Sequence, residues 1–280
     1  MFLQSDVGFS WADPADTAMP ESVELKLRID PRLYGSDRRE TDGRLARVMA
    51  EAAREVGLVF EPSSEDELSD LVCYFDTAEG ALAKHHLTLR QKFPMGRQGP
   101  ASAGVLMLKE RRDTPLLRET VEAFRSGLAA DLSSKVEIDA VGLADGVPGR
   151  LRRVWSVSAK GVRASIDGGR TSDLTTDFPY LARCGCDHVG PLQLSTPPVI
   201  ALEATIGSLV FADRRLPVTV VLWRELSDAG EDGRRAGSLR LAELSWKLMP
   251  SFDPMDRHER LHRRLQDRTD LFEAGRFKTE

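Results

Sequence analysis

The most regular pattern in the chain is an alternation of apolar and polar residues that begins at residue 22. Every second position of residues 22–29 is apolar, and the positions between them hold Ser22, Glu24, Lys26 and Arg28. Successive side chains of a strand point to opposite faces of its sheet. These residues therefore predict a strand with one apolar face and one ionic face.

The same alternation returns with a cationic face farther along the chain. Residues 71–75 and 87–92 predict two strands on either side of an acidic turn at 76–77, and residues 104–113 predict a third strand. One face of the later two strands holds Thr88, Arg90, Lys92, Met107, Lys109 and Arg111. We expect these cations to be aimed at a common side of a sheet.

The rest of the chain predicts one helix, further strands and irregular connections. Residues 41–58 repeat apolar side chains at helical spacing up to Gly57, which predicts an amphipathic helix packed on the sheet. Further strands are predicted at 116–124, 152–158, 162–167, 199–207, 216–226 and 238–248, with a turn at 159–161. Residues 126–149 are interpreted as a short helical or irregular connection, 170–198 as a long loop, and 254–277 as a surface helix.

Composition limits the classes of partner. The 280 residues are 41% hydrophobic and 30% charged, with a formal net charge of −5. A general binder of nucleic acid or anionic membrane needs a basic field, so any anion site must be local. The N-terminal residues lack a cationic start, and no run of about eighteen apolar residues follows, so we expect a cytoplasmic protein. Three cysteines are too few for a disulfide framework, which agrees with a reducing compartment.

The ionic strand faces must meet water or a charged ligand, because unpaired charges are costly to bury. One interpretation is an antiparallel sheet with an ordinary solvated face. If the strands close into a barrel, its lumen could hold a polyanion among these cations: Lys26, Arg28, Arg90, Lys92, Lys109, Arg111, Arg118, Arg153 and Arg163. The acids of the same set would hold Mg²⁺ or Mn²⁺: Glu24, Glu122, Asp167, and Glu203 or Glu243.

Residues 72–92 also carry a sequence signature. Tyr74-x-Asp76-Thr77 is followed by Leu87-x-Leu89-Arg90, and this order is similar to the central signature of the CYTH superfamily, the triphosphate tunnel metalloenzymes. The resemblance is strongest here and extends more weakly over residues 21–207. It implies an α+β fold, an antiparallel β-barrel or tunnel of about eight strands with flanking helices. We expect an N-terminal arm at 1–20 and a single tunnel domain at 21–280 with an extended C-terminal third and a terminal helix.

The resemblance also assigns roles to residues of this sequence. The family's phosphate-binding arginine and lysine match Arg90 and Lys109, and its Asp-x-Gly matches Asp167 and Gly169. The arginine before the penultimate hairpin matches Arg152 or Arg153. The family's three acidic strands match Ser22-Glu24-Lys26, Arg118-Thr120-Glu122, and a last strand around either Glu203 or Glu243. Each acidic pair of the family keeps only one carboxylate, so the phosphate-binding cations are better retained than the metal ligands.

In function, the resemblance implies a metal-dependent phosphohydrolase that acts on an inorganic, organic or nucleoside triphosphate in a cationic tunnel. Glu24, Glu122 and Lys26 would be its catalytic residues, and Mg²⁺ or Mn²⁺ its cofactor. Three alternatives remain: a non-catalytic polyphosphate- or nucleotide-binding module, an adenylyl cyclase-type lyase, and a different small-molecule enzyme on the same scaffold. Neither a nucleic-acid polymer nor a membrane is expected as a partner, and the oligomeric state is left open.

Overall fold

The computed structural model describes residues 16–34, 38–63, 68–96, 99–142, 151–166, 169–188, 190–226, 236–268 and 270–272. Its strands are β1 (Ser22–Ile29), β2 (Val59–Pro62), β3 (Leu68–Asp76), β4 (Leu87–Gly96), β5 (Gly99–Pro100), β6 (Ala103–Arg112), β7 (Ser133–Gly142), β8 (Leu151–Ala164), β9 (Gln193–Leu194), β10 (Val199–Phe211), β11 (Arg214–Leu226) and β12 (Ala236–Leu248). Its helices are α1 (Arg38–Glu55), α2 (Ala81–Lys84), α3 (Arg118–Arg125), α4 (Tyr180–Arg183) and α5 (Met255–Gln266), with 3-10 turns at Pro31–Leu33 and Thr171–Leu174.

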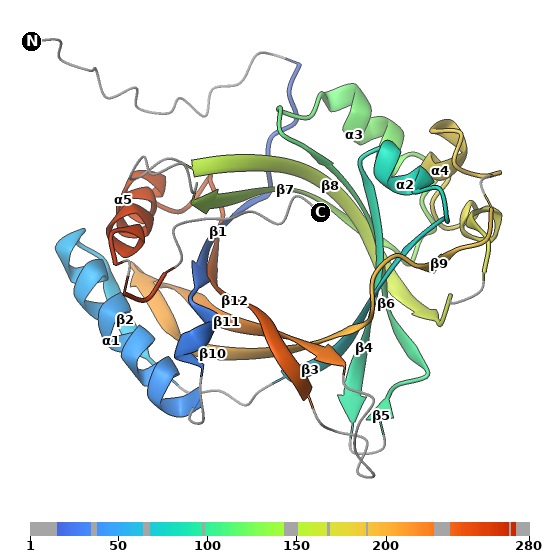
Figure 1. The fold of residues 1–280 in the computed structure, drawn as a ribbon. Coiled ribbons are helices and arrows are strands. Elements are labelled where there is room, and N and C mark those ends of the chain that lie inside the picture. Colours follow the sequence, from blue (N-terminus) through green and yellow to red (C-terminus); the bar gives the residue numbers. More distant parts are fainter. Residues whose placement is uncertain are drawn as a thin grey trace, which may run out of the picture.

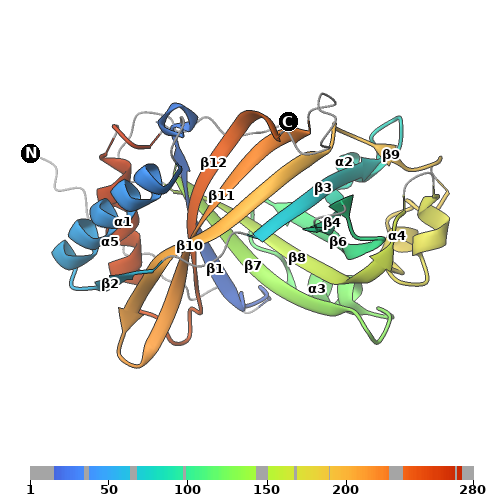
Figure 2. The same ribbon diagram turned by 90° about the horizontal axis from the view of Figure 1, so that it is seen from below.

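The strands form one sheet that closes on itself. Its hydrogen-bonded order is β2-β10-β11-β12-β1-β7-β8-β6-β4-β3-β9, and a further pairing joins β10 to β3. Of the described strands, β10, β11, β12, β1, β7, β8, β6, β4 and β3 therefore close a ring. Figure 1 shows the ring of strands end-on, and Figure 2 shows the molecule turned by 90°. The predicted α+β tunnel with flanking helices is confirmed.

One pairing in the ring is parallel. Strand β1 pairs antiparallel with β12 on one side and parallel with β7 on the other. This arrangement sets Glu24 opposite both Lys247 of β12 and Asp139 of β7. Because residues directly opposite each other share a face, the ionic face of β1 continues onto both neighbours.

The main hydrophobic core lies outside the ring, between its wall and the helices that flank it. The apolar face of β1, including Leu25 and Ile29, belongs to one buried cluster with Met49 of α1 and Leu261 of α5. Helices α1 and α5 pack against each other beside β1 (Figure 1). The helix predicted at 41–58 is confirmed as α1. With its apolar face used outside, β1 presents its ionic face to the interior of the ring.

The strand predicted at 116–124 is wrong, because residues 118–125 form helix α3. Val121 and Phe124 are buried, and the Phe124 ring lies 5.1 Å from that of Tyr180. A spacing of three residues brings both side chains to one face of a helix, whereas a strand would point them to opposite faces. The short segment fits both periodicities, and its packing against α4 selects the helix.

Two predictions around residues 126–170 are also wrong. Residues 133–142 form strand β7 rather than a helical or irregular connection. Residues 151–164 form one continuous strand, β8, without the predicted turn at 159–161. Gly161 lies inside β8 opposite Leu106, and a Cβ atom there would collide with the side chain of Leu132. This glycine therefore permits close packing instead of making a turn.

The last third of the chain contains the predicted strands and the terminal helix. Within the segment predicted as a long loop, residues 193–194 form β9, which pairs with the end of β3. Helix α5 packs on the ring, because Met255, His258, Leu261, His262 and Leu265 are all buried. In the described part of the chain, no helix is both long and apolar enough to cross a membrane.

Candidate functional site

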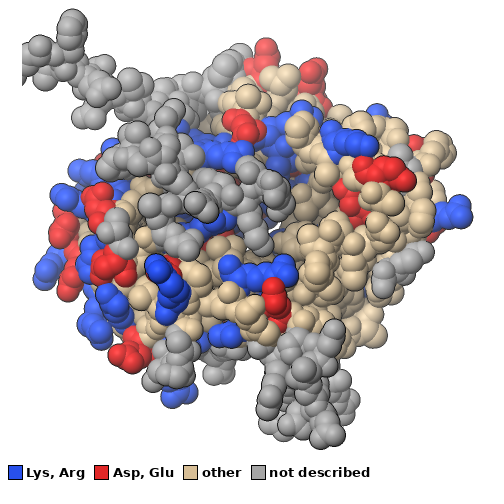
Figure 3. All heavy atoms as spheres, in the orientation of Figure 1, with Lys and Arg blue, Asp and Glu red and all other residues tan. Residues whose placement is uncertain are grey.

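A cationic cavity of about 460 Å³ lies inside the ring. The described residues that line it include eight cations, Lys26, Arg90, Lys92, Lys109, Arg111, Lys135, Lys160 and Lys247, and four acids, Glu24, Asp70, Glu137 and Glu203. Figure 3 shows Lys and Arg side chains gathered around the opening. The excess of positive charge is local, because the whole chain has a net charge of −5. An anion is the ligand that such a lining favours.

Strand register places these side chains together. Within each strand the lining residues are two positions apart, as in Arg90 and Lys92 of β4. Between the neighbouring strands β4 and β6 the lining residues lie opposite each other, since Arg90 pairs with Met107 and Lys92 with Val105. Alternate positions of several neighbouring strands therefore supply a continuous polar interior.

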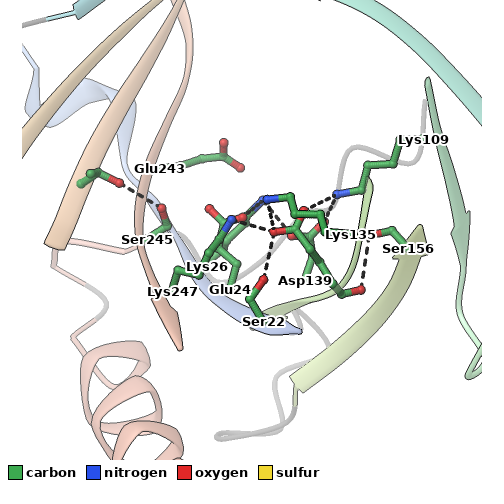
Figure 4. Close-up of polar contacts among 12 residues, drawn as sticks. Ser22, Glu24, Lys26, Lys109, Lys135, Asp139, Ser156, Glu243, Ser245 and Lys247 are labelled. Atoms are coloured by element: carbon green, nitrogen blue, oxygen red, sulfur yellow. Dashed lines mark hydrogen bonds and ion pairs between the residues drawn. The ribbon is translucent and has the colours of Figure 1, made fainter. Parts of the chain in front are cut away.

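Six of the lining residues form a lysine–carboxylate network with the buried Asp139 (Figure 4). Its members are Lys26, Lys109, Lys135, Lys247, Glu24, Glu137 and Asp139. Its centre is the buried carboxylate of Glu137. The ammonium groups of Lys135 and Lys247 each lie 2.7 Å from Glu137 Oε1, which also accepts a hydrogen bond of 3.1 Å from Ser22 Oγ. Lys109 Nζ approaches the other oxygen, Oε2, at 3.7 Å.

Asp139 is the second buried acid of the network, and two lysines share it. Lys26 Nζ lies 3.1 Å from Asp139 Oδ1, and Lys109 Nζ lies 3.3 Å from Oδ2. Lys26 also reaches Glu24 Oε2 at 3.2 Å. Four lysines from β1, β6, β7 and β12 thus hold three carboxylates from β1 and β7. Buried charges are tolerated when they are paired and hydrogen-bonded in this way.

The network shifts the pKa values of its members. Burial alone would raise the pKa of Glu137, but Lys109 and the hydrogen bonds from Lys135 and Lys247 lower it to about 2. Lys26 and Lys109 similarly overcome burial and hold the pKa of Asp139 far below its usual range. Both acids therefore stay ionised at neutral pH.

The lysines respond differently from one another. Burial opposes the charge of Lys26, but Glu24, Asp139 and Glu243 raise its pKa well above the usual value. Burial lowers the pKa of Lys109 to about 8. The carboxylates raise this pKa in part, but the nearby cations Arg111 and Lys26 lower it again. Lys109 is therefore still mostly protonated at neutral pH, and an approaching anion would further favour its charged form.

Three further cations face the cavity from β4 and β6. The buried Nε atom of Arg90 has no hydrogen-bond partner among the described residues. Arg111 donates a 2.7 Å hydrogen bond to Thr88 Oγ1, and Lys92 lies 2.8 Å from Asp70. A buried guanidinium nitrogen without a partner is costly, so Arg90 is the side chain best placed to gain from an incoming oxygen ligand.

The structure brings together many of the site residues predicted from the sequence. Those that line the cavity are Glu24, Lys26, Arg90, Lys92, Lys109, Arg111 and Glu203. Arg28 and Glu243 pair with each other on β1 and β12, on the same strand faces as Lys26 and Ser245, but neither lines the cavity. Asp167 lies outside the described residues.

Four other predicted site residues point away from the cavity or lie outside the ring. Arg118 and Glu122 are exposed on α3, which lies outside the ring. Arg153 pairs with Glu259 of α5 at 3.2 Å, and Arg163 pairs with Asp131 and Asp177 at 2.7 and 2.6 Å. Arg153 and Arg163 occupy odd positions of β8, whereas Lys160 lines the cavity from an even position. Strand alternation therefore directs the two arginines to the outer face.

The acids that sequence reasoning missed come mainly from β7. Glu137 and Asp139 alternate with Val136, Ile138 and Ala140, so a strand pattern was present in residues 133–142. Together with Lys135 they supply a cation and two acids at alternate positions, the order that the resemblance assigns to residues 118–122. The cations Lys160 and Lys247 were missed as well, although Lys247 lies at alternate positions with Glu243 and Ser245 in the strand predicted at 238–248.

The described carboxylates do not fit the divalent cation that the resemblance implies. No three His, Cys, Asp or Glu side chains come together as a metal-binding group in the described part of the chain. Glu137, Asp139 and Glu24 are already bound by lysine ammonium groups. An ion such as Mg²⁺ needs oxygen ligands at about 2.1 Å in a near-octahedral arrangement, which this donor set does not offer. Metal binding stays a prediction that titration must test.

An apolar wall adjoins the cavity on the inner face of the ring. It consists of Val72, Val199 and Ala201, with the partly buried Tyr74, Val221 and Trp223 packed on them. Tyr74 lies opposite Arg90, and Val221 lies opposite Glu203, so the wall continues from residues that line the cavity. Trp223 Nε1 donates a 3.0 Å hydrogen bond to Glu243 Oε2, which fixes the indole ring. The interior thus combines a cationic region with an aromatic one.

Comparison with known proteins gives similarity only at the level of solved structures. No protein-family model matches the chain, and no curated protein matches its sequence. HpAC1 from Hippeastrum, described as an adenylyl cyclase candidate with a dominant triphosphatase activity, is 14% identical with a TM-score of 0.46, covering 91% of each chain. An adenylate cyclase candidate from Bacillus halodurans is 10% identical with a TM-score of 0.39, covering 93% of this chain and 95% of that one. At these scores, neither similarity carries an argument about activity.

Proposed function

We propose that the protein binds a triphosphate-like polyanion in the cavity inside its ring. The observation that carries this proposal is the lining of eight cations against four acids in a chain that is acidic as a whole. Lys and Arg make strong charge-assisted hydrogen bonds to phosphate oxygens. The cavity volume of about 460 Å³ suits a small molecule rather than a polymer.

The apolar wall supports an organic triphosphate over inorganic triphosphate. Trp223 and Tyr74 offer aromatic surface next to cations that would hold the phosphate chain. A flat heterocycle attached to that chain would cover the wall, whereas inorganic triphosphate would leave it in contact with water. Thiamine triphosphate and ATP are therefore the two organic ligands to test.

Hydrolysis of the bound triphosphate is the second candidate, and Glu203 favours it. Its carboxylate lines the cavity, and among the described residues it has neither a hydrogen bond nor an ion pair. Such a carboxylate can accept a proton from a water molecule that attacks the terminal phosphorus, while a new P–O bond forms and the phosphoanhydride bond breaks. The proton then passes to the bridging oxygen of the leaving diphosphate group, and the surrounding cations offset the charge that develops there.

Incubation with a panel of ligands tests binding and turnover together. The ligands are inorganic triphosphate, thiamine triphosphate and ATP, each with EDTA, Mg²⁺ or Mn²⁺. We expect the triphosphates to raise the midpoint of thermal unfolding, because a ligand at 100 times its Kd adds about 2.7 kcal/mol of stability. Released phosphate identifies a hydrolase, and a cyclic nucleotide identifies a lyase. Absence of stabilisation by all three ligands would refute the proposed function.

The Glu203→Gln variant separates binding from hydrolysis. If Glu203 accepts the proton, the variant should release phosphate at least about tenfold more slowly. Its affinity for triphosphate should be retained or improved, because one negative charge leaves the cavity. Phosphate release is measured by colorimetry and affinity by calorimetry. Unchanged turnover in a folded variant would remove Glu203 from the mechanism.

Trp223→Leu tests the role of the apolar wall. Stacking of a base on an aromatic side chain contributes about 1–3 kcal/mol, so the variant should bind ATP about tenfold more weakly. Inorganic triphosphate is the control ligand, and its affinity should change by less than about twofold because it has no ring to stack. Both affinities are measured by calorimetry. An equal loss for the two ligands would mean that Trp223 shapes the cavity rather than binding a ring.

A further inference from the structure

Lysine ammonium groups already bind all three carboxylates of the lysine–carboxylate network, Glu24, Glu137 and Asp139. Each of its three carboxylates accepts at least one ammonium group at 3.3 Å or less. Glu137 Oε1 alone has three donors, from Ser22, Lys135 and Lys247. The two oxygens of a carboxylate share about four lone-pair sites, so three donors leave Glu137 Oε1 no free position for a cation.

Charge leads to the same conclusion. Four ammonium groups face three carboxylates within the network, so its summed charge is already positive. A divalent cation placed among them would be repelled by the lysines and would have to displace them from buried acids. A phosphate chain would instead meet unused N–H donors, because each ammonium group has three.

We propose that the ammonium groups of Lys109, Lys135 and Lys247 take the place of a divalent cation, so that this cavity binds its polyanion without metal. Glu137 and Asp139 then act as anchors that hold the lysines in position. Arg90 adds a guanidinium with an unpartnered buried nitrogen on another side of the cavity. This inference rests on the proposed function, since it states how the same ligand is held.

Calorimetric titration of the full-length protein with inorganic triphosphate is the first test. We expect the Kd in EDTA to lie within about twofold of the Kd in metal-free buffer. Excess Mg²⁺ should weaken the apparent affinity, because it complexes the ligand in solution. A Kd that tightens about tenfold or more when Mg²⁺ or Mn²⁺ is added would overturn the inference. Lack of binding in every buffer would instead refute the proposed function itself.

Direct Mn²⁺ binding, followed by electron paramagnetic resonance, is the second test and needs no turnover. The wild-type protein should not bind Mn²⁺ at micromolar concentrations. The Lys109→Met and Lys247→Met double variant, which frees oxygens of Glu137 and Asp139, should gain Mn²⁺ affinity of about tenfold or more and lose triphosphate affinity. Lys247→Met alone, at a half-exposed position, should show the same trend if the double variant does not fold.

Lys160→Met is the matched control for this gain. Lys160 lines the cavity but has no ion pair among the described residues, so its removal frees no carboxylate. This variant should not gain Mn²⁺ binding. Micromolar Mn²⁺ binding by the wild type, or an equal gain in Lys160→Met, would overturn the inference.

Discussion

Replacing Arg90 by glutamine is expected to weaken triphosphate binding about 100-fold, which corresponds to about 2.7 kcal/mol. Arg90 lines the cavity from β4, and its buried Nε atom has no hydrogen-bond partner in the described part of the chain. Hydrogen bonds to charged groups contribute about 1.5–3 kcal/mol, and a guanidinium can make two to one phosphate. Calorimetry with inorganic triphosphate measures the loss.

Arg153→Gln is the matched control for Arg90. Arg153 is also half-buried on a strand of the ring, but it points outward and pairs with Glu259 of α5. Its removal should leave triphosphate affinity within about twofold of the wild type. If both variants lose affinity equally, the loss reflects general charge or stability rather than a contact with the ligand. Similar unfolding midpoints of the two variants would show that both are folded.

The ring could be predicted because its strands carry strong local patterns. Residues 22–29 alternate strictly, and residues 87–92 and 104–113 keep part of the same pattern. The apolar side chains at every second position of these segments, which include Leu25, Leu89 and Leu108, pack outside the ring. Closure of a sheet leaves the ionic half facing inward, so the positions of Lys26, Arg90 and Lys109 followed from the fold. For these residues, the alternation of side chains along a strand is enough to predict which way the side chain points.

The remaining site residues depend on contacts that are not local in sequence. Residues 118–125 carry a weak strand alternation that Glu119 interrupts, whereas Val121 and Phe124 share one helix face. Contact of Phe124 with Tyr180 of α4 favours the helix. The acidic strand beside β1 is therefore β7 and not residues 118–122, so its acids are Glu137 and Asp139 instead of Glu122. On β8, the choice of inward side chains depends on whether residues 159–161 form a turn. Gly161 suggests a turn, but it lies inside a continuous strand, where it permits close packing. These errors place Arg153 and Arg163 on the wrong face.

Pairing within the cavity could not be predicted from residue types. The sequence shows that many cations and a few acids share inward faces, but not which acid each lysine reaches. Lys109 lies on β6 and meets Asp139 of β7, although β8 separates these strands in the sheet. Such a contact depends on the curvature of the closed ring. It changes the functional conclusion, because acids that are held by lysines are not free metal ligands.

The terminal helix is coupled directly to the strand that carries Lys26. His262 Nε2 of α5 lies 2.8 Å from the backbone oxygen of Lys26, and its ring lies 5.9 Å from that of Trp246 on β12. His258, one helical turn earlier, is fully buried, and neither of its ring nitrogens has a partner among the described residues. Docking of α5 therefore depends on two imidazoles that must be neutral when they are buried.

The protein is expected to lose stability between pH 6.5 and pH 4, before most carboxylates titrate. Burial lowers the pKa of both His258 and His262 to about 4, against an ordinary value of 6.5. Below pH 6.5 the unfolded chain therefore binds protons that the folded chain refuses, so the free energy of unfolding falls. The loss is about 2 kcal/mol for each histidine at pH 5, and it is complete once the folded imidazoles are protonated below pH 4.

Urea unfolding at pH 7, 6 and 5 measures this loss and assigns it to α5. The His258→Leu and His262→Gln double variant should show a flatter dependence on pH, whatever its stability at pH 7, because neither replacement titrates. His85→Gln, which changes an exposed histidine in the turn after α2, should keep the wild-type dependence. The buried acid Glu137, with a pKa of about 2, acts only below about pH 4.5, so its contribution lies outside this window. A wild-type protein as stable at pH 5 as at pH 7 would mean that both histidines are readily protonated while α5 remains docked.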